Sequence, residues 1–160
     1  MVTKEELESV WTPKTKAIVI ISPSNPTGMV YTKEDLQPIA DFAVEKDLYV
    51  ISDEIYEKLI YEENKKHVSI ASLNNDIFSR TIVINGVSKS YSMTGWRIGF
   101  AAAPKEIAKL MISIQSHMTS NPNSIAQKAA LAAVVGDQSC VEEMRQEFAK
   151  RRDYIFEREE

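Results

Sequence analysis

The sequence is poor in several features that define specialised protein classes. Cys140 is the only cysteine among 160 residues, so an intrachain disulfide is impossible. There are only 5 glycines and 6 prolines, which excludes a collagenous repeat and argues against a disordered chain. The longest unbroken apolar run extends from Ala129 to Val135, far short of the ~20 residues that span a bilayer. We therefore expect a globular protein with no membrane partner.

The charge balance lacks a basic surplus. The chain has 19 Lys and Arg residues against 23 Asp and Glu residues, a formal net charge of −4, and the basic residues are scattered among the acidic ones. Nucleic-acid-binding domains usually concentrate positive charge on one face, so no nucleic-acid partner is expected. The start of the chain, Lys4-Glu5-Glu6, is too acidic for a secretory signal. Together with the lone cysteine, this predicts a cytoplasmic protein.

Short apolar, β-branched runs predict the strands. Residues 16–21, 48–52 and 81–85 resemble strands that are buried on both faces, as in a parallel sheet. A fourth run covers residues 97–103, and no full helical pattern separates it from the third. Because parallel strands need a long crossover, the fourth strand is expected to run antiparallel to its neighbours.

Helical patterns follow the first strand and fill the end of the chain. Thr32 opens the first helix with a capping-box variant; Pro38 lies late for this start and could cost a backbone hydrogen bond or delay the helix. Residues 62–76 indicate a loop with a short helical turn. After Pro104, which suits a first helical position, three helices are expected. The first has an apolar stripe of Ile107, Leu110, Met111 and Ile114, and the second is capped by Asn123. The third has an apolar stripe of Val141, Met144, Phe148 and Ile155. This order of elements predicts an α/β fold with a mainly parallel sheet.

Polar and reactive side chains follow each of the first three strands. The sequence SPSNPTG, which includes Asn25, follows the first, Asp53 and Tyr56 follow the second, and Ser88 and Lys89 follow the third. Ligands of open α/β sheets bind outside the carboxyl ends of the strands. With Arg97 nearby in sequence, this edge offers an amide, a carboxylate, a phenol, an amine and a guanidinium. Such a set suits an anionic, aromatic ligand with a reactive carbonyl.

Three strings carry a family resemblance: SPSNPTG, SDEIY and SKSYSMTGWRIG, in this order. Together they resemble the fold-type I pyridoxal-phosphate enzymes of the class I/II aminotransferases, in particular the aspartate and aromatic branch. The resemblance implies a three-layer α/β/α fold and pyridoxal 5'-phosphate as cofactor. It also implies transamination between an amino acid, aspartate or aromatic, and a 2-oxo acid.

The resemblance also implies roles for individual residues. Lys89 would bind the cofactor covalently and then carry the proton of the catalysed shift, as general base and acid. Asp53 would pair with the pyridine nitrogen of the cofactor, and Tyr56 and Asn25 would hydrogen-bond its phenolic oxygen.

The phosphate contacts follow in the same way. Arg97 would bind the cofactor phosphate, with Ser88 as a further donor. Many relatives carry a serine three residues before the lysine, where this chain has Gly86, so one usual phosphate contact is missing. We assign no catalytic or binding role to residues outside these motifs. His67 and His117 lack metal-ligand spacing, so no metal site is expected. Residues 150–152 are expected to form a solvated helix face.

Aminotransferases of this type are longer chains, so the resemblance also implies a central fragment. Residues 1–136 would belong to the cofactor-binding large domain, and residues 137–160 would begin the long helix that leads to a small domain. The family forms homodimers, and residues 117–122 resemble the segment that relatives direct towards the neighbouring subunit. Two alternatives remain open at this stage: a non-catalytic regulatory domain of aminotransferase type, and a pyridoxal-phosphate-dependent lyase on the same fold.

Overall fold

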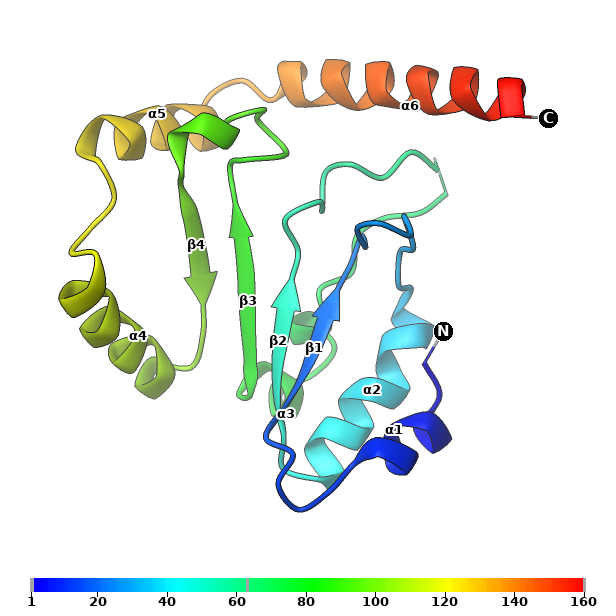
Figure 1. Cartoon of the computed structure of the whole chain (residues 1–160), viewed down its shortest axis with the longest axis vertical. Coiled ribbons are helices and arrows are strands. Elements are labelled where there is room, and N and C mark those ends of the chain that lie inside the picture. Colours follow the sequence, from blue (N-terminus) through cyan, green and yellow to red (C-terminus); the bar gives the residue numbers. More distant parts are fainter. Residues whose placement is uncertain (1, 63, 160) are drawn as a thin grey trace.

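The structure is a computed structural model that describes residues 2–62 and 64–159, and its centre is a four-stranded sheet (Figure 1). β1, β2 and β3 run parallel, and β4 pairs with β3 in the antiparallel direction. The predicted α/β class, the mainly parallel sheet and the reversed fourth strand are thereby confirmed. The strands lie side by side in chain order: β1 (Ala17–Ile21), β2 (Tyr49–Asp53), β3 (Thr81–Gly86) and β4 (Gly99–Ala102).

The register brings the carboxyl ends of the three parallel strands level with one another. Asp53 of β2 lies beside Ile21 of β1 on one side and beside Ile84 of β3 on the other. The pairing continues just past the strands, because the Ser22 amide donates to the Asp53 carbonyl at 3.1 Å. The loops that follow the parallel strands therefore leave the sheet from the same edge.

One face of the sheet is covered by helices and holds the core. Helix α2 (Lys33–Glu45) packs there with the 3₁₀ turn η1 (Ile70–Ser72) and the short helix α3 (Asn75–Phe78). Each large apolar side chain buried in this way contributes about 1.5–3 kcal/mol. The most deeply buried members of this core include Leu36, Phe42, Leu48, Val50, Ile70 and Ile77.

Helix α2 begins where its capping residues predict. The Thr32 hydroxyl accepts a hydrogen bond from the Asp35 amide at 3.3 Å, and the Asp35 carboxylate accepts one from the Thr32 amide at 2.8 Å. Pro38 lies inside the helix and does not delay its start. It removes one backbone donor, and the burial of the apolar face offsets that loss.

The first helix of the chain, α1 (Lys4–Val10), was not predicted from the apolar pattern. It contains no buried residue and lies against α2. Its sequence signal is a capping box, because Thr3 and Glu6 exchange hydrogen bonds between side chain and backbone. The Lys4–Glu45 ion pair, 2.7 Å between Nζ and Oε2, connects it to α2.

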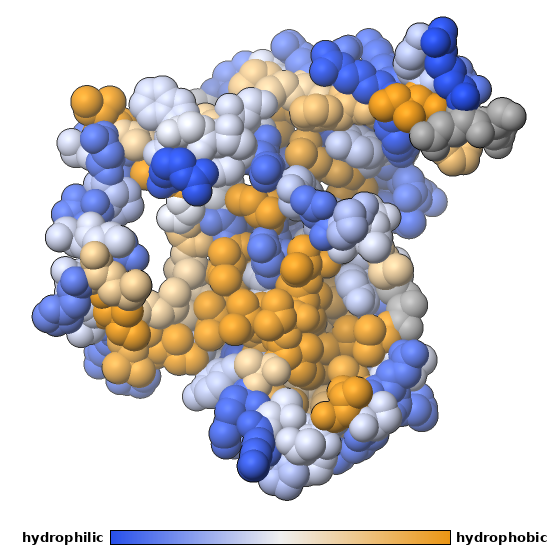
Figure 2. Space-filling view, viewed as in Figure 1, coloured by the Kyte–Doolittle hydropathy of each residue, from blue (hydrophilic) through white to orange (hydrophobic). Residues whose placement is uncertain are grey.

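The opposite face of the sheet is open among the described residues. Val19 is 64% exposed, and Tyr49 and Ile84 on the same face are also exposed. Figure 2 shows apolar side chains gathered over the middle of the molecule. Of the two helical layers expected, the described residues therefore supply the one that carries α2 and α3.

The last three helices lie away from this open face, beyond β4 and along the top of the molecule in Figure 1. Pro104 caps α4 and is not its first helical residue. The expected apolar stripe of α4 is not buried, since Leu110 is 65% exposed and Ile114 is 58% exposed. Within the described residues, no helix is both long and apolar enough to cross a membrane. The three helices are α4 (Lys105–Met118), α5 (Ser124–Val135), capped by Asn123 as predicted, and α6 (Ser139–Glu159).

Gly86, at the end of β3, allows β4 to approach closely. A Cβ atom at this position would lie 2.8 Å from the Ile98 carbonyl oxygen and 3.0 Å from the Gly99 Cα. Both contacts are to backbone, so they can be relieved only by moving the strand. The serine that many relatives carry here does not fit this arrangement of β3 and β4.

We predict that Gly86→Ser destabilises the protein. Forcing extra atoms into a well-packed site costs about 1–3 kcal/mol, and the free energy of unfolding in urea measures the loss. Gly95→Ser is the matched control, because a Cβ at Gly95 meets nothing within 4 Å. Equal stabilities of the two variants would contradict the close approach at Gly86.

Candidate active site

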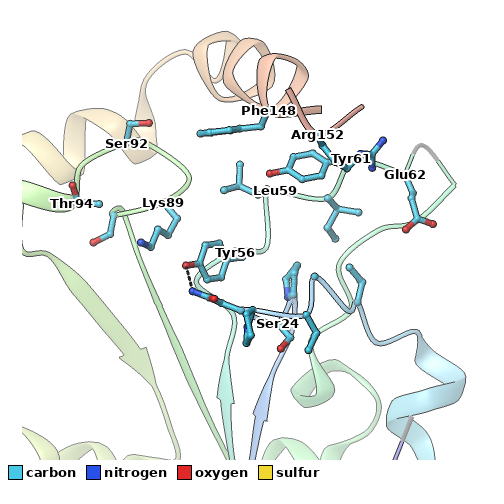
Figure 3. A pocket seen from close by; sticks show the side chains of 18 residues that line it. Ser24, Tyr56, Leu59, Tyr61, Glu62, Lys89, Ser92, Thr94, Phe148 and Arg152 are labelled. Carbon is cyan, nitrogen blue, oxygen red and sulfur yellow. Dashed lines mark hydrogen bonds between the residues drawn. The ribbon is translucent and has the colours of Figure 1, made fainter. Parts of the chain in front are cut away.

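A cavity of about 830 Å³ opens at the carboxyl ends of the parallel strands (Figure 3). It is built by the loops that follow β1, β2 and β3, with one wall from α6, so it lies where open α/β sheets bind ligands. Four of the six predicted site residues line it: Asn25, Tyr56, Ser88 and Lys89.

Lys89 lies in the turn that follows β3. Val87 and Ser90 on either side are buried, and the Ser92 amide donates to the Lys89 carbonyl at 3.2 Å. The Lys89 amine lies 5.5 Å from the centre of the Tyr56 ring, and both side chains line the cavity (Figure 3). No carboxylate in the described part of the chain forms an ion pair with this amine. An amine of this kind, half-buried and without a counter-charge, is suited to attack a carbonyl carbon once deprotonated.

Asn25 and Tyr56 meet across the cavity from two different loops. The Asn25 amide donates from Nδ2 to the Tyr56 hydroxyl at 3.2 Å. Asn25 is placed by a tight turn in which the Gly28 amide donates to the Ser24 carbonyl at 2.8 Å. Gly28 has a φ of +70°, a backbone conformation that glycine adopts without strain. The pair presents an amide and a phenol to the same side of the cavity as the Lys89 amine.

Asp53, the last residue of β2, is not among the residues that line the cavity. Its Oδ1 accepts a hydrogen bond from the Ile55 amide at 3.1 Å. Within the described residues, its other carboxylate oxygen has no hydrogen-bond partner. One oxygen of Asp53 is therefore left to accept a bond from a ligand.

Arg97 also lies outside the cavity lining and is exposed. It follows the 3₁₀ turn η2 (Thr94–Trp96) with a φ of 56°, and its guanidinium donates to the Thr94 carbonyl at 3.0 Å. No ion pair to Arg97 is present in residues 2–62 and 64–159. The guanidinium keeps donors for an anion, although the geometry does not bring it to the four lining residues.

The wall from α6 was missed by the sequence analysis. Phe148 and Arg152 line the cavity from α6, and the Arg152 guanidinium lies 5.4 Å from the centre of the Tyr61 ring. Residues 150–152 are all exposed, as predicted, and the Arg152 side chain remains 46% exposed while it lines the cavity. The available signal was the spacing of four residues between Phe148 and Arg152, which puts both on one side of a helix.

A buried polar cluster lies next to the site and was also missed. The Glu54 carboxylate accepts hydrogen bonds from the Ser52 and Ser69 hydroxyls at 2.9 and 2.6 Å, and His67 Nε2 lies 2.8 Å from its other oxygen. Burial raises the pKa of Glu54, but these three hydrogen bonds outweigh it and hold the pKa below its ordinary value.

Glu57 lies beside this cluster, and the three side chains of Glu54, Glu57 and His67 offer metal-ligand atoms within 4.8 Å of one another. Both Glu54 oxygens and the facing His67 nitrogen are already hydrogen-bonded. Hydrogen bonding thus accounts for the arrangement without a metal ion.

The donor set of the cavity fits one kind of ligand. It combines an amine that has no ion-pair partner among the described residues, an amide–phenol pair and a serine hydroxyl, and the Asp53 carboxylate and the Arg97 guanidinium lie outside the lining. An aromatic molecule with a carbonyl, a phenolic oxygen, a ring nitrogen and an anionic group would use each of these.

Comparison with known proteins agrees with this chemistry. Among curated relatives, an aspartate aminotransferase of Geobacillus stearothermophilus is 54% identical over 157 residues, which cover 98% of this chain and 40% of the relative. The aromatic-amino-acid aminotransferase 2 of Thermococcus litoralis is 48% identical over 156 residues, with coverages of 96% and 40%. The chain thus spans about 40% of the length of these relatives.

Solved structures show the same arrangement of the backbone. The aspartate aminotransferase from Thermus thermophilus with maleate matches with a TM-score of 0.92 at 43% identity, over 98% of this chain and 41% of that one. The aromatic aminotransferase from Pyrococcus horikoshii matches with a TM-score of 0.92 at 45% identity, over 99% and 42%. The family profile described as aminotransferase class I and II matches residues 2–158. By its sequence and by its backbone, the chain belongs to the class I and II aminotransferases.

Proposed function

We propose that this chain is the cofactor-binding part of a longer pyridoxal-phosphate-dependent aminotransferase. The observation that carries the proposal is the Lys89 amine, which lies beside the Asn25–Tyr56 pair at the carboxyl ends of the parallel strands and has no ion-pair partner among the described residues. Pyridoxal 5'-phosphate, when bound, supplies an electron sink for the α-carbon of the amino acid.

The residues of this chain would divide the work by their chemistry. Lys89 binds the cofactor carbonyl and afterwards moves the proton of the substrate α-carbon at its Nζ. Asp53 would use the carboxylate oxygen that has no hydrogen-bond partner among the described residues to hold the proton on the ring nitrogen. Asn25 and Tyr56 donate to the phenolic oxygen, and their mutual hydrogen bond positions both donors.

Ser88 and Arg97 are the proposed ligands of the cofactor phosphate. Ser88 lines the cavity, and the planar guanidinium of Arg97 can give two charge-assisted hydrogen bonds to a phosphate. Gly86 offers no side chain for this role.

The proposed substrates are an amino acid and a 2-oxo acid, with aspartate or an aromatic amino acid as the donor. This choice is supported by the relatives, which are aspartate and aromatic-amino-acid aminotransferases. We assign residues 1–136 to the large domain and residues 137–160 to the helix that leads out of it. We also place the enzyme in the cytoplasm, in keeping with its single cysteine.

A homodimer is the proposed assembly. The exposed apolar side chains of α4, including Leu110 and Ile114, support it, because large exposed apolar patches usually mark contacts. Light scattering on the protein at the length of its relatives tests it, and a dimer mass is expected.

Lys89 is predicted to be the lysine that bonds the cofactor. Borohydride reduction of the full-length protein with pyridoxal phosphate, followed by peptide mass spectrometry, should place the label on the peptide that contains Lys89. Lys89→Ala should remove the label, whereas Lys105→Ala, on exposed α4, should keep it. A label on another lysine of the wild-type protein would contradict the assignment.

Asp53→Asn should slow transamination by about 10²–10³-fold, the usual loss when one fixed electrostatic group is removed from a reacting centre. The amide oxygen of asparagine can still accept from the Ile55 amide, so the fold and cofactor binding should persist. Initial rates and an absorbance titration measure the two effects. Asp41→Asn, on the exposed side of α2, is the control, and equal rates for both variants would refute the role of Asp53.

A further inference from the structure

Glu54 is a buried carboxylate that directly follows Asp53 and that the proposed reaction does not use. It is only 4% exposed, and each of its two oxygens has at least one hydrogen-bond partner. A buried carboxylate is costly unless it is fully hydrogen-bonded. A charge kept at this position therefore calls for a role beyond filling the core.

The partners of Glu54 come from two segments that lie apart in sequence. Ser52 belongs to β2, whereas His67 and Ser69 precede η1, whose Ile70 lies in the core. His67 Nδ1 is buried and has no partner within the described residues. A hydrogen on Nδ1 would have no acceptor, so we assign the hydrogen of the neutral imidazole to Nε2. Nε2 then donates to the Glu54 carboxylate. The cluster connects the end of β2 to the core beneath it.

Asp53 and Glu54 point to opposite sides of the same strand end. Successive side chains of a strand alternate in direction, and Ser52 faces the core with Val50. Glu54 consequently reaches the covered side, while Asp53 reaches the open side. The two residues share one peptide bond, so the direction of one constrains the direction of the other.

The backbone around the pair is held on the Glu54 side. The Glu54 amide donates to the Ile84 carbonyl of β3 at 2.9 Å, and the Glu57 amide donates to the Glu54 carbonyl at 2.9 Å. The Asp53 carboxylate is itself attached to the Ile55 amide. The orientation of Asp53 therefore depends on the backbone from 53 to 55, which contains Glu54.

We propose that Glu54 is a positioning residue, which acts through its hydrogen bonds to Ser52, His67 and Ser69 to fix the strand end and to aim the Asp53 carboxylate at the cofactor ring nitrogen. This inference rests on the proposed function. It assigns Glu54 no contact with substrate or cofactor.

The test uses Glu54→Gln in the full-length protein, with Glu57→Gln as the matched control. Glutamine preserves the size of the side chain and an acceptor for the serine hydroxyls, but its NH₂ group faces the Nε2–H of His67. Glu57 is a neighbouring carboxylate whose side chain accepts none of the hydrogen bonds of the cluster.

The first readout is the protonation of the cofactor ring nitrogen, measured by ¹⁵N NMR with labelled pyridoxal phosphate. Wild type and Glu57→Gln should hold the proton, and Glu54→Gln should shift the signal towards the unprotonated nitrogen, as Asp53→Asn does. An unchanged signal in Glu54→Gln with a shifted signal in Asp53→Asn would overturn the positioning role alone. An unchanged signal in both variants would overturn the proposed function and this inference with it.

The second readout separates positioning from general loss of structure. Glu54→Gln should lower kcat by about 10–100-fold, the range expected for a misplaced catalytic group, with little change in the affinity for pyridoxal phosphate. A cofactor methylated at the ring nitrogen carries a fixed positive charge and needs no aspartate, so it should restore much of the loss. A loss that this analogue does not reduce would show a merely structural role.

The third readout needs no cofactor. Folding lowers the pKa of Glu54 from its ordinary value of 4.5. The ionised carboxylate therefore stabilises the fold at pH values above 4.5. This stabilisation is lost as the pH falls through the lowered value. His67 and Glu57 are the titratable groups beside it. The stability difference between wild type and Glu54→Gln should shrink on acidification, and a constant difference would count against the ionised cluster.

If Glu54→Gln does not fold, Ser69→Ala replaces it. This change removes one donor to Glu54, at 2.6 Å, and leaves the carboxylate and His67 in place. It should produce the same ¹⁵N shift and the same recovery with the methylated cofactor, both smaller in size. Absence of both effects in a folded Ser69→Ala protein would overturn the proposal.

Discussion

The parallel pairing of β1, β2 and β3 is the constraint on which the rest of the molecule depends. It sets Ile21, Asp53 and Ile84 in one row, and hydrogen bonds continue the pairing past the strand ends. Three loops from distant parts of the chain are thereby delivered to one edge. Without that register, the Asn25–Tyr56 hydrogen bond and the approach of Lys89 to the Tyr56 ring could not form.

The sequence predicts well those features that depend on neighbouring residues. The β-branched runs became the strands, and Thr32 became the cap of α2, because strand burial and helix capping are decided within a few residues. The helix α1 was not predicted, although Thr3 and Glu6 form a capping box. It has only seven residues and buries none of them, so its sequence shows little apolar periodicity. The α4 stripe was found, but its exposure was not, because periodicity indicates which side is apolar and not what covers it.

The site divides in the same way. Position after a strand identified Asn25, Tyr56, Ser88 and Lys89, and the structure brings these four residues to one cavity. The Glu54–His67 contact joins residues that lie 13 positions apart, and Arg152 of α6 contacts Tyr61 in a distant loop. No local sequence pattern predicts either contact. Asp53 and Arg97 lie outside the lining of the cavity, so proximity in sequence to a strand end did not show which residues line it.

The cavity has two kinds of wall, one made of loops and one made of a helix. The groups that would touch a cofactor stand on the loops that follow the strands, whereas Phe148 and Arg152 stand on α6. Arg145 of that helix donates to the Ile60 carbonyl at 3.2 Å, and Gln138, just before the helix, accepts a hydrogen bond from the Tyr91 hydroxyl at 2.9 Å. Ile60 belongs to the loop that carries Tyr56, and Tyr91 belongs to the turn that carries Lys89. The helical wall of the cavity is therefore attached to the same loops that hold the reacting groups.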